Sequence, residues 1–504
     1  MRAWLLVVLV ACNVDRSPHR EPRDPHTLRF STNHQVATLD PAIAYDDVST
    51  WITHALYDTL VDYAAGGTQL VPRLAERWEV SGDGRRYHFW LRPGIAYADG
   101  RPIVAADFQT SFRRTLARAD SPYAQYLAAI DHVAILGDRE LEIVLKQPDA
   151  TFLYVLGMTF TAPLRADHAG DLRREPLASG PYMLELWDEG ERIVLRRNPH
   201  YVDPARAHIE RIEMLENIPR DTQFLMFEKG DLDAAERLSS ADTLWLLEQP
   251  AWQPYVHIAP QMNVFGIRMN VRRKPFDDRR VRQALNYALD KDHTVKLLNG
   301  GAVPSHGILP PGMFGRDDTL PPYPHDPAKA RALLAAAGYP HGFDVDYVTI
   351  GDEEGETTAA SIQADFAEVG VRVHITPMSL TAYETAIASP DGPPFSMGTW
   401  LADYPDPSNF LDPRFHSRFI GSSNDSYYSN PELDALLDAA HVETDPTRRT
   451  ALYHRAERIL YDDAPWVWNY HHEMTEVDQP YLQGYTPHPV WGRDYTSARL
   501  EAVR

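Results

Sequence analysis

The pattern of expected secondary structure changes near Asn263, and this change constrains the fold more than any other feature of the chain. Before it, short alternating strands are joined by tight turns. In one such hairpin, the turn Ser81-Gly82-Asp83-Gly84 separates the strands expected over 75–80 and 86–91. The glycines of this turn supply the positive φ that a tight turn requires. After Asp326, helical and strand patterns alternate. That alternation predicts an α/β body with right-handed crossovers and a largely parallel sheet.

Two apolar strands lie at the borders between these regions. One is expected over Asn263–Val271 and the other over Trp466–Tyr470. A chain that passes twice between two bodies can bend there, and a cleft then lies between the bodies. The sequence therefore predicts an α/β protein with two lobes, two hinge strands and an interlobe cleft.

The N-terminus has the pattern of an export signal. Met1-Arg2 supplies a small positive charge, and residues 3–10 form a short apolar segment. This segment is too short to span a membrane and is typical of a secretory signal. The sequence predicts export from the cytoplasm.

The export segment ends in Leu9-Val10-Ala11-Cys12, which resembles the lipobox of bacterial lipoproteins. The resemblance implies a signal peptide over 1–12 and acylation of Cys12. A lipidated cysteine of this kind carries several acyl chains and anchors stably, whereas one chain alone binds a membrane only marginally. A lone buried cysteine is the alternative. Residues 13–26 have almost no apolar bulk and are expected to form a disordered tether.

Composition excludes several classes of protein. The 504 residues include 49 Lys and Arg against 71 Asp and Glu, a formal charge of −22, whereas a nucleic-acid-binding protein needs a basic face. Cys12 is the sole cysteine, so an intramolecular disulfide and any site with two thiolates are excluded. No run of about 20 apolar residues predicts an ordinary membrane span.

Short motifs from about Thr27 to the C-terminus resemble, in order, those of the extracytoplasmic solute-binding proteins of peptide ABC transporters. This is the oligopeptide- and dipeptide-binding group, family 5 of the bacterial solute-binding proteins. The most diagnostic stretch is 75–107, with Trp78-Glu79-Val80, Leu91-Arg92-Pro93-Gly94 and Asp99-Gly100. The other motifs include Leu39-Asp40-Pro41, Leu56-Tyr57-Asp58-Thr59-Leu60, Gly180-Pro181-Tyr182, Asn198-Pro199-His200-Tyr201 and Trp400-Leu401-Ala402-Asp403-Tyr404-Pro405-Asp406-Pro407.

The resemblance implies a two-lobed periplasmic-binding-protein fold with an extra inserted domain. Lobe I is expected over 27–62, 176–262 and 473–504, the inserted domain over 63–175, and lobe II over 263–471. The implied function is not enzymatic. A monomeric, lipid-anchored protein of the periplasm would capture peptides in the cleft and deliver them to an ABC permease, without a cofactor and without nucleic acid.

The resemblance also implies a ligand site centred on Asp403. In peptide binders of this family, the aspartate after the Trp-x-Ala stretch meets the ammonium group of the ligand, whose burial is costly without a carboxylate partner. Trp400, Ala402 and Tyr404 are expected beside it. The alternative reading of Asp403 is a turn residue that forms local hydrogen bonds.

Two further positions follow from the same resemblance. Gln35 and Val36 match positions near the N-terminus of the peptide. In contrast, Met397 stands where some oligopeptide binders have an arginine available to a ligand carboxylate. Ligand length and recognition of the ligand's C-terminus stay open.

Catalytic and metal sites find little support in the sequence. There is no nucleophile elbow, zinc-protease motif, phosphate loop or dinucleotide fingerprint. His471-His472-Glu473 is the most metal-like cluster, but adjacent residues of a strand point to opposite faces, so no metal site is expected. Acidic pairs such as Glu353-Glu354 are expected at helix ends and on solvated faces. Two alternatives stay open: the same fold binding another solute, such as a sugar, a nickel chelate or an opine, and a secreted hydrolase.

Overall fold

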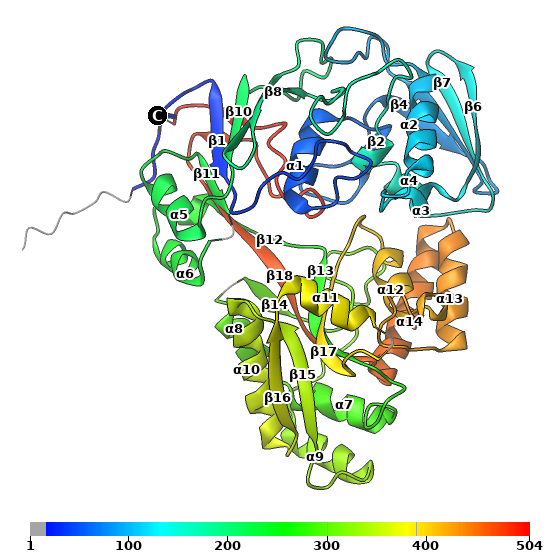
Figure 1. The fold of residues 1–504 in the computed structure, drawn as a ribbon, viewed down its shortest axis with the longest axis vertical. Helices are drawn as coiled ribbons and strands as arrows, with labels where there is room; N and C mark the ends of the chain where they lie inside the picture. The colour runs from blue at the N-terminus through cyan, green and yellow to red at the C-terminus, as the bar shows by residue number, and fades with distance from the viewer. Residues whose placement is uncertain (1–16, 237, 300, 390, 504) are drawn as a thin grey trace, which may run out of the picture.

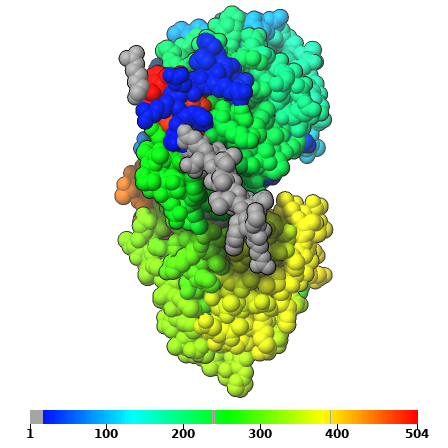
Figure 2. All heavy atoms as spheres, turned by 90° about the vertical axis from the view of Figure 1, so that its left-hand side faces the viewer, coloured from blue at the N-terminus to red at the C-terminus, as the bar shows by residue number. Residues whose placement is uncertain are grey.

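The computed structural model describes residues 17–236, 238–299, 301–389 and 391–503. Two α/β lobes lie one above the other (Figure 1), and the boundary between them crosses the middle of the molecule in the view of Figure 2. The prediction of a two-lobed α/β fold is confirmed. The signal segment 1–12 and Cys12 lie outside the described residues. Within the described ranges, no helix is both long and apolar enough to cross a membrane.

Lobe I contains a four-stranded sheet in which one pair of strands is parallel. Helix α1 (Asp47–Leu56) covers it, and Ile52 and Leu56 belong to the same buried cluster as Leu28 of the sheet. The helix begins where the Asp46 side chain accepts a hydrogen bond from the Ser49 backbone at 2.8 Å. The strands, in spatial order, are β1 (Thr27–Ser31), β10 (Arg211–Leu215), β9 (Arg192–Arg197) and β8 (Tyr182–Asp188).

The expected inserted domain contains a second, antiparallel sheet. Helix α2 (Ala105–Ala117) packs on this sheet through Phe108 and Phe112. The strand order is β4 (Ala75–Val80), β5 (Arg86–Leu91), β7 (Glu140–Leu145) and β6 (Ile130–Gly137). The smaller elements nearby are β2 (Val61–Tyr63), β3 (Leu70–Pro72), α3 (Ala124–Leu127), α4 (Phe152–Val155) and the 3₁₀ helix η1 (Thr159–Thr161).

The sheet of lobe II is mixed, so the prediction of a largely parallel sheet is wrong. Among the described strands, β15 (Asp344–Ile350) runs parallel to β16 (Arg372–Met378) and β17 (Phe395–Leu401). These three strands are linked by crossover helices. By contrast, β13 (Asn263–Met269) and β18 (Trp466–Asp478) connect to the other lobe and pair antiparallel to each other. The helices are α7 (Arg279–Ala288), α8 (Lys291–Leu297), α9 (Pro327–Ala336), α10 (Glu353–Glu368), α11 (Leu380–Ala388), α12 (Ser408–Phe415), η3 (Ser417–Phe419), α13 (Pro431–Val442) and α14 (Pro446–Asp463).

Strand β18 crosses from one lobe to the other (Figure 1). Its first half pairs with β13 and with β14 (Ala302–Pro304) of lobe II. Its second half pairs with β12 (Val256–Pro260) and β11 (Ala234–Glu236) of lobe I. The second connection runs from β12 through Gln261 and Met262 into β13. The remaining elements of lobe I are α5 (Arg220–Glu228), α6 (Ser240–Glu248), η2 (Gln253–Tyr255), β19 (Leu482–Gln483) and β20 (Arg499–Leu500).

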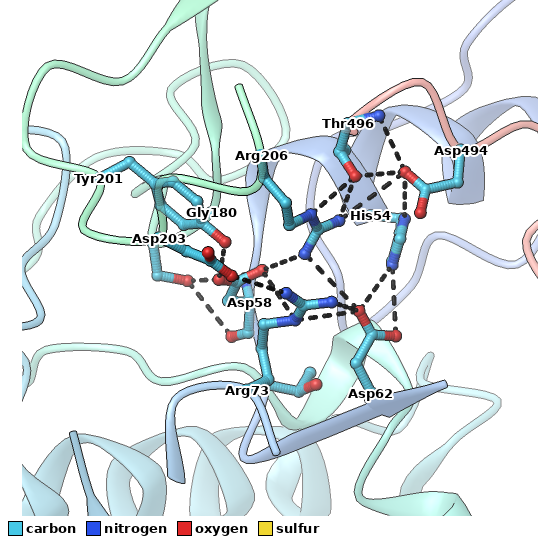
Figure 3. A network of polar contacts seen from close by, with 12 residues as sticks. His54, Asp58, Asp62, Arg73, Gly180, Tyr201, Asp203, Arg206, Asp494 and Thr496 are labelled. Carbon is cyan, nitrogen blue, oxygen red and sulfur yellow. Dashed lines mark hydrogen bonds and ion pairs between the residues drawn. The ribbon is translucent and has the colours of Figure 1, made fainter. Parts of the chain in front are cut away.

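A buried polar network joins distant parts of the chain near the base of the inserted domain (Figure 3). Arg206 donates to Asp58 at 3.3 Å and to the Thr496 hydroxyl at 2.8 Å. Arg73 donates to Asp62 at 2.8 Å. The network holds segments of all three parts of the expected lobe I together. The exact residue bounds of the lobes and of the inserted domain stay a prediction.

Residues 17–26 differ from the disordered tether that the sequence suggested. The His19 backbone donates to the Gln479 side chain at 2.9 Å, and the His19 ring lies 2.9 Å from the Glu228 carbonyl. The Arg20 carbonyl accepts from the backbone of Val503 at 2.9 Å. Hydrogen bonds to lobe I thus order a polar segment that has no apolar face of its own.

Candidate functional site

A cavity of about 720 Å³ lies between the two lobes, beside the two connections that pass from one lobe to the other. Tyr45, Trp51 and the 488–492 segment line it from lobe I, with Tyr123 and Met158 from the inserted domain. Lobe II and the hinge strand supply the opposite side, with Asn263, Phe265, Leu297, Glu353, Glu354, Leu401, Ala402, Asp403, His472, Glu473, Met474 and Thr475.

Asp403 lies just beyond the end of β17 and faces this cavity. Its backbone nitrogen donates to the Asn409 side chain at 2.9 Å, which fixes the turn. Its Oδ2 accepts hydrogen bonds from the Tyr126 hydroxyl at 2.5 Å and from Asn409 Nδ2 at 3.3 Å. Tyr126 belongs to the inserted domain, so the carboxylate bridges the two sides of the cavity.

The polar partners of Asp403 are uncharged. Burial raises the pKa of the Tyr126 and Tyr45 hydroxyls, and the nearby Asp403 carboxylate raises both further. Both tyrosines therefore remain neutral donors at neutral pH. Among the described residues, no arginine, lysine or histidine forms an ion pair with Asp403. A half-buried carboxylate with only neutral partners can accept a cation from a ligand.

The structure brings Ala402 into the cavity beside Asp403, but Trp400 and Tyr404 do not line it. The Trp400 indole donates to Asn409 at 3.3 Å and stacks against the Arg414 guanidinium, 5.3 Å from the ring centre. Tyr404 is buried and packs edge-on against Tyr126. Both rings pack against the turn that carries Asp403, on the side away from the cavity.

Gln35 and Val36 lie away from the cavity. Val36 is buried and its backbone donates to Glu216 at 2.9 Å, whereas Gln35 is exposed near the β8–β9 turn. The next residue, Ala37, donates to the Ser49 hydroxyl at 3.0 Å. These bonds hold the loop on lobe I, so the structure does not bring these two residues to the cavity.

The hinge end of the cavity contains polar residues that the sequence reasoning did not assign to the site. Glu354 Oε1 lies 2.7 Å from the His472 ring and accepts from the Tyr470 hydroxyl at 2.7 Å. Burial opposes the ionisation of Glu354, but these two partners hold its pKa below the usual value. Strand alternation could have indicated His472, because adjacent residues of a strand point to opposite faces. His471 is buried against Asn263, while His472 faces Glu354.

No group of three or more His, Cys, Asp or Glu residues that could hold a metal ion occurs within the described ranges. Met397, which stands where some oligopeptide binders have an arginine, is buried in the core of lobe II. Arg220, at the start of α5, is the one Arg or Lys among the described residues that line the cavity.

Two α/β lobes that enclose a cavity at a pair of connecting strands define the class of two-lobed binding proteins. The chain belongs to the bacterial extracellular solute-binding proteins, family 5: residues 69–422 match the middle region of that family.

Similar proteins cover almost the whole chain. Heme-binding protein A of Haemophilus influenzae is 29% identical over 526 residues, which cover 96% of this chain and 95% of that protein. Di/tripeptide-binding protein 2 of Pseudomonas aeruginosa is 28% identical and covers 95% of each chain. The solved structure of the periplasmic binding protein DppA from Helicobacter pylori in complex with the peptide STSA has a TM-score of 0.79 at 28% identity. It covers 94% of this chain and 98% of that one.

Proposed function

We propose that this protein binds peptides in the interlobe cavity and that Asp403 pairs with the ligand's terminal ammonium group. The observation that carries the proposal is the half-buried Asp403 carboxylate, whose hydrogen-bond partners among the described residues are all neutral. A terminal ammonium supplies the missing positive charge and three donors. The relatives named as di/tripeptide-binding protein and as a DppA–peptide complex support this choice of ligand.

Calorimetry on four combinations tests the proposal: wild type and Asp403→Asn, each with a short free-amine peptide and its N-acetylated form. Removal of one partner of a buried charge pair costs about 3–5 kcal/mol. Acetylation should therefore weaken binding to the wild type about 10²- to 10³-fold. The variant should bind both forms about equally weakly.

Asp221→Asn is the matched control, because Asp221 also lines the cavity but lies exposed on α5. It should leave the sensitivity to acetylation unchanged. If Asp403→Asn binds free-amine peptides within about threefold of the wild type, Asp403 is a turn residue. A sugar, nickel chelate or opine that binds in place of every peptide tested would reassign the ligand. Peptide cleavage seen by mass spectrometry would reassign the protein as a hydrolase.

We further propose that Cys12 is acylated and that the monomeric protein is anchored to a bacterial membrane in the periplasm, where it delivers peptides to an ABC permease. The lipobox-like segment Leu9-Val10-Ala11-Cys12 supports this proposal. Cys12→Ser should remove the lipid mass and shift the protein from the membrane to the soluble fraction. A wild-type protein that carries no lipid and fractionates as soluble would rule the anchor out.

A further inference from the structure

Part of one edge of the hinge strand β18 has no partner among the described strands where the strand passes the cavity. Strands β12 and β13 follow one another along one edge of β18. Along the other edge, β14 pairs as far as His472 and β11 starts at Glu476. The backbone nitrogen of Glu473 donates to the Gly301 carbonyl at 2.9 Å, and no described strand pairs with Met474 or Thr475 on this second edge. Glu473, Met474 and Thr475 all line the cavity.

Two polar side chains on this stretch have no hydrogen-bond partner for their side-chain oxygens among the described residues. Glu473 and Thr475 are two residues apart on a strand, so their side chains point to the same face. Glu473 is half-buried, and its carboxylate makes no hydrogen bond or ion pair with any described residue. Thr475 is only 8% exposed, and its hydroxyl has no hydrogen-bond partner within the described part of the chain.

Glu354, another carboxylate at this end of the cavity, has hydrogen-bond partners. Glu354 accepts from both Tyr470 and His472. Glu473, by contrast, loses solvation without compensation, and its burial raises its pKa. A half-buried carboxylate and a buried hydroxyl on the same face of a strand are satisfied by a cationic group with several donors, such as a lysine ammonium or an arginine guanidinium.

The position of this pair relative to Asp403 matches the length of a short peptide. Leu401, near Asp403, pairs with Asn263 at the start of β13, and β13 pairs with β18. Two strand spacings separate β17 from β18, about 10 Å. An extended peptide covers that distance in about three residues. A ligand whose terminal ammonium meets Asp403 therefore places its second or third side chain near Glu473.

We propose that Glu473 and Thr475 form a subsite for a cationic side chain, so that the cavity favours short peptides with lysine or arginine after the first residue. This inference rests on the proposed peptide-binding function and names the substrate class of the same cavity. Glu473 supplies a negative charge and Thr475 a hydroxyl oxygen to the cationic side chain of the ligand, which lies beside the open part of the strand edge.

The test compares Ala-Lys-Ala and Ala-Ala-Lys with the same peptides carrying Nε-acetyl-lysine, which keeps the shape but removes the charge. The wild type should bind at least one of the lysine peptides about 10- to 100-fold more tightly than its acetylated form. Glu473→Gln should reduce this preference to about threefold or less, and Thr475→Val should reduce it in part. Because burial raises the pKa of Glu473, the preference should also weaken as the pH falls.

Glu368→Gln is the matched control, since Glu368 is exposed at the end of α10 and does not line the cavity. It should keep the preference. The subsite is ruled out if the wild type binds the charged and neutral peptides equally, or if Glu473→Gln keeps the preference. Binding of Ala-Ala-Ala that depends on Asp403 without any lysine preference would overturn the subsite alone. Loss of all peptide binding would overturn the proposed function itself.

Discussion

Asp403 and Asp406 belong to the same turn, yet their partners give them different roles. Asp406 is fully buried, and both of its oxygens accept from Arg449, at 2.6 and 2.8 Å. Asp403 faces the cavity, and its donors among the described residues are neutral. A buried carboxylate with an arginine is already neutralised, whereas one without a cation is available to a ligand.

Replacing Asp406 by alanine should destabilise the protein strongly. The substitution leaves the Arg449 guanidinium buried without its carboxylate, which costs about 3–5 kcal/mol of unfolding free energy. Urea unfolding followed by circular dichroism measures the loss. Asp403→Asn should leave the unfolding midpoint almost unchanged, and an equal loss in both variants would contradict the distinction between them.

Replacing Tyr126 by phenylalanine should weaken peptide binding without unfolding the protein. The variant removes the hydroxyl that holds Asp403 Oδ2, so the carboxylate loses a fixed orientation. A hydrogen bond to a charged group of this kind corresponds to about a tenfold change in affinity for free-amine peptides. Calorimetry should show little change for N-acetylated peptides, and an equal loss for both would indicate general damage.

The sequence led to Asp403 and Ala402 because the motif around them is local and continuous. Glu354 and His472 were not predicted together, because 118 residues separate them and only strand pairing brings them into contact. Gln35 and Val36 lie away from the cavity because the Val36 backbone is bonded to Glu216, 180 residues further along the chain, and a contact of that kind cannot be predicted from a local motif. Their role in ligand binding stays a prediction.

At the scale of elements, β18 extends further than its apolar pattern indicated. The expected strand ended at Tyr470, but the element continues to Asp478 through Glu473, Glu476 and other polar residues. Such residues argue against a buried strand when read alone. They are tolerated here because β11 and β12 pair with the backbone and because Arg493 lies against Glu476.

Glu476 should make the stability of the hinge depend on pH. Burial, together with Glu236 and Asp478, raises its pKa to about 7 against the opposing effects of Arg493 and the Tyr485 hydroxyl. The unfolded carboxyl has a pKa of about 4.3, so the folded state alone holds the proton between these values. Stability from this group is therefore present at low pH and is lost as the pH rises towards 7.

Thermal unfolding of the wild type and Glu476→Gln between pH 4.5 and 8 measures this effect. The melting temperature of the variant relative to the wild type should rise across that range, because the variant has no proton to lose. Glu501→Gln, at an exposed site, should show a constant difference. A difference that does not change with pH for Glu476→Gln would contradict the assignment.

At the scale of the whole molecule, two connections join the lobes within the described part of the chain, β18 and the β12–β13 passage (Figure 1). The cavity lies between these connections and the Asp403–Tyr126 contact. A ligand that touches both sides stabilises the arrangement in which the lobes are closest. Rotation about the two connections is therefore the expected response to binding.

Small-angle scattering should show a smaller radius of gyration with saturating free-amine peptide than without it. The peptide contacts both lobes only in the closed arrangement, so binding draws the population towards it. The N-acetylated peptide at the same concentration is the control and should leave the profile unchanged. Identical profiles with and without bound free-amine peptide would contradict hinge closure.

The polar network of Figure 3 joins residues that leave the ribosome at widely separated times during synthesis. Arg206 donates to Thr496, which follows it by 290 residues, and Arg493 pairs with Glu236 at 3.0 Å. Lobe I therefore cannot complete its buried charge pairs until the segment around 493–496 has emerged. The inserted domain draws almost all of its buried cluster from residues 60–177 and can form much earlier. A chain interrupted before Arg493 would thus carry a formed inserted domain on an unfinished lobe, with buried arginine and glutamate side chains left for proteases to detect.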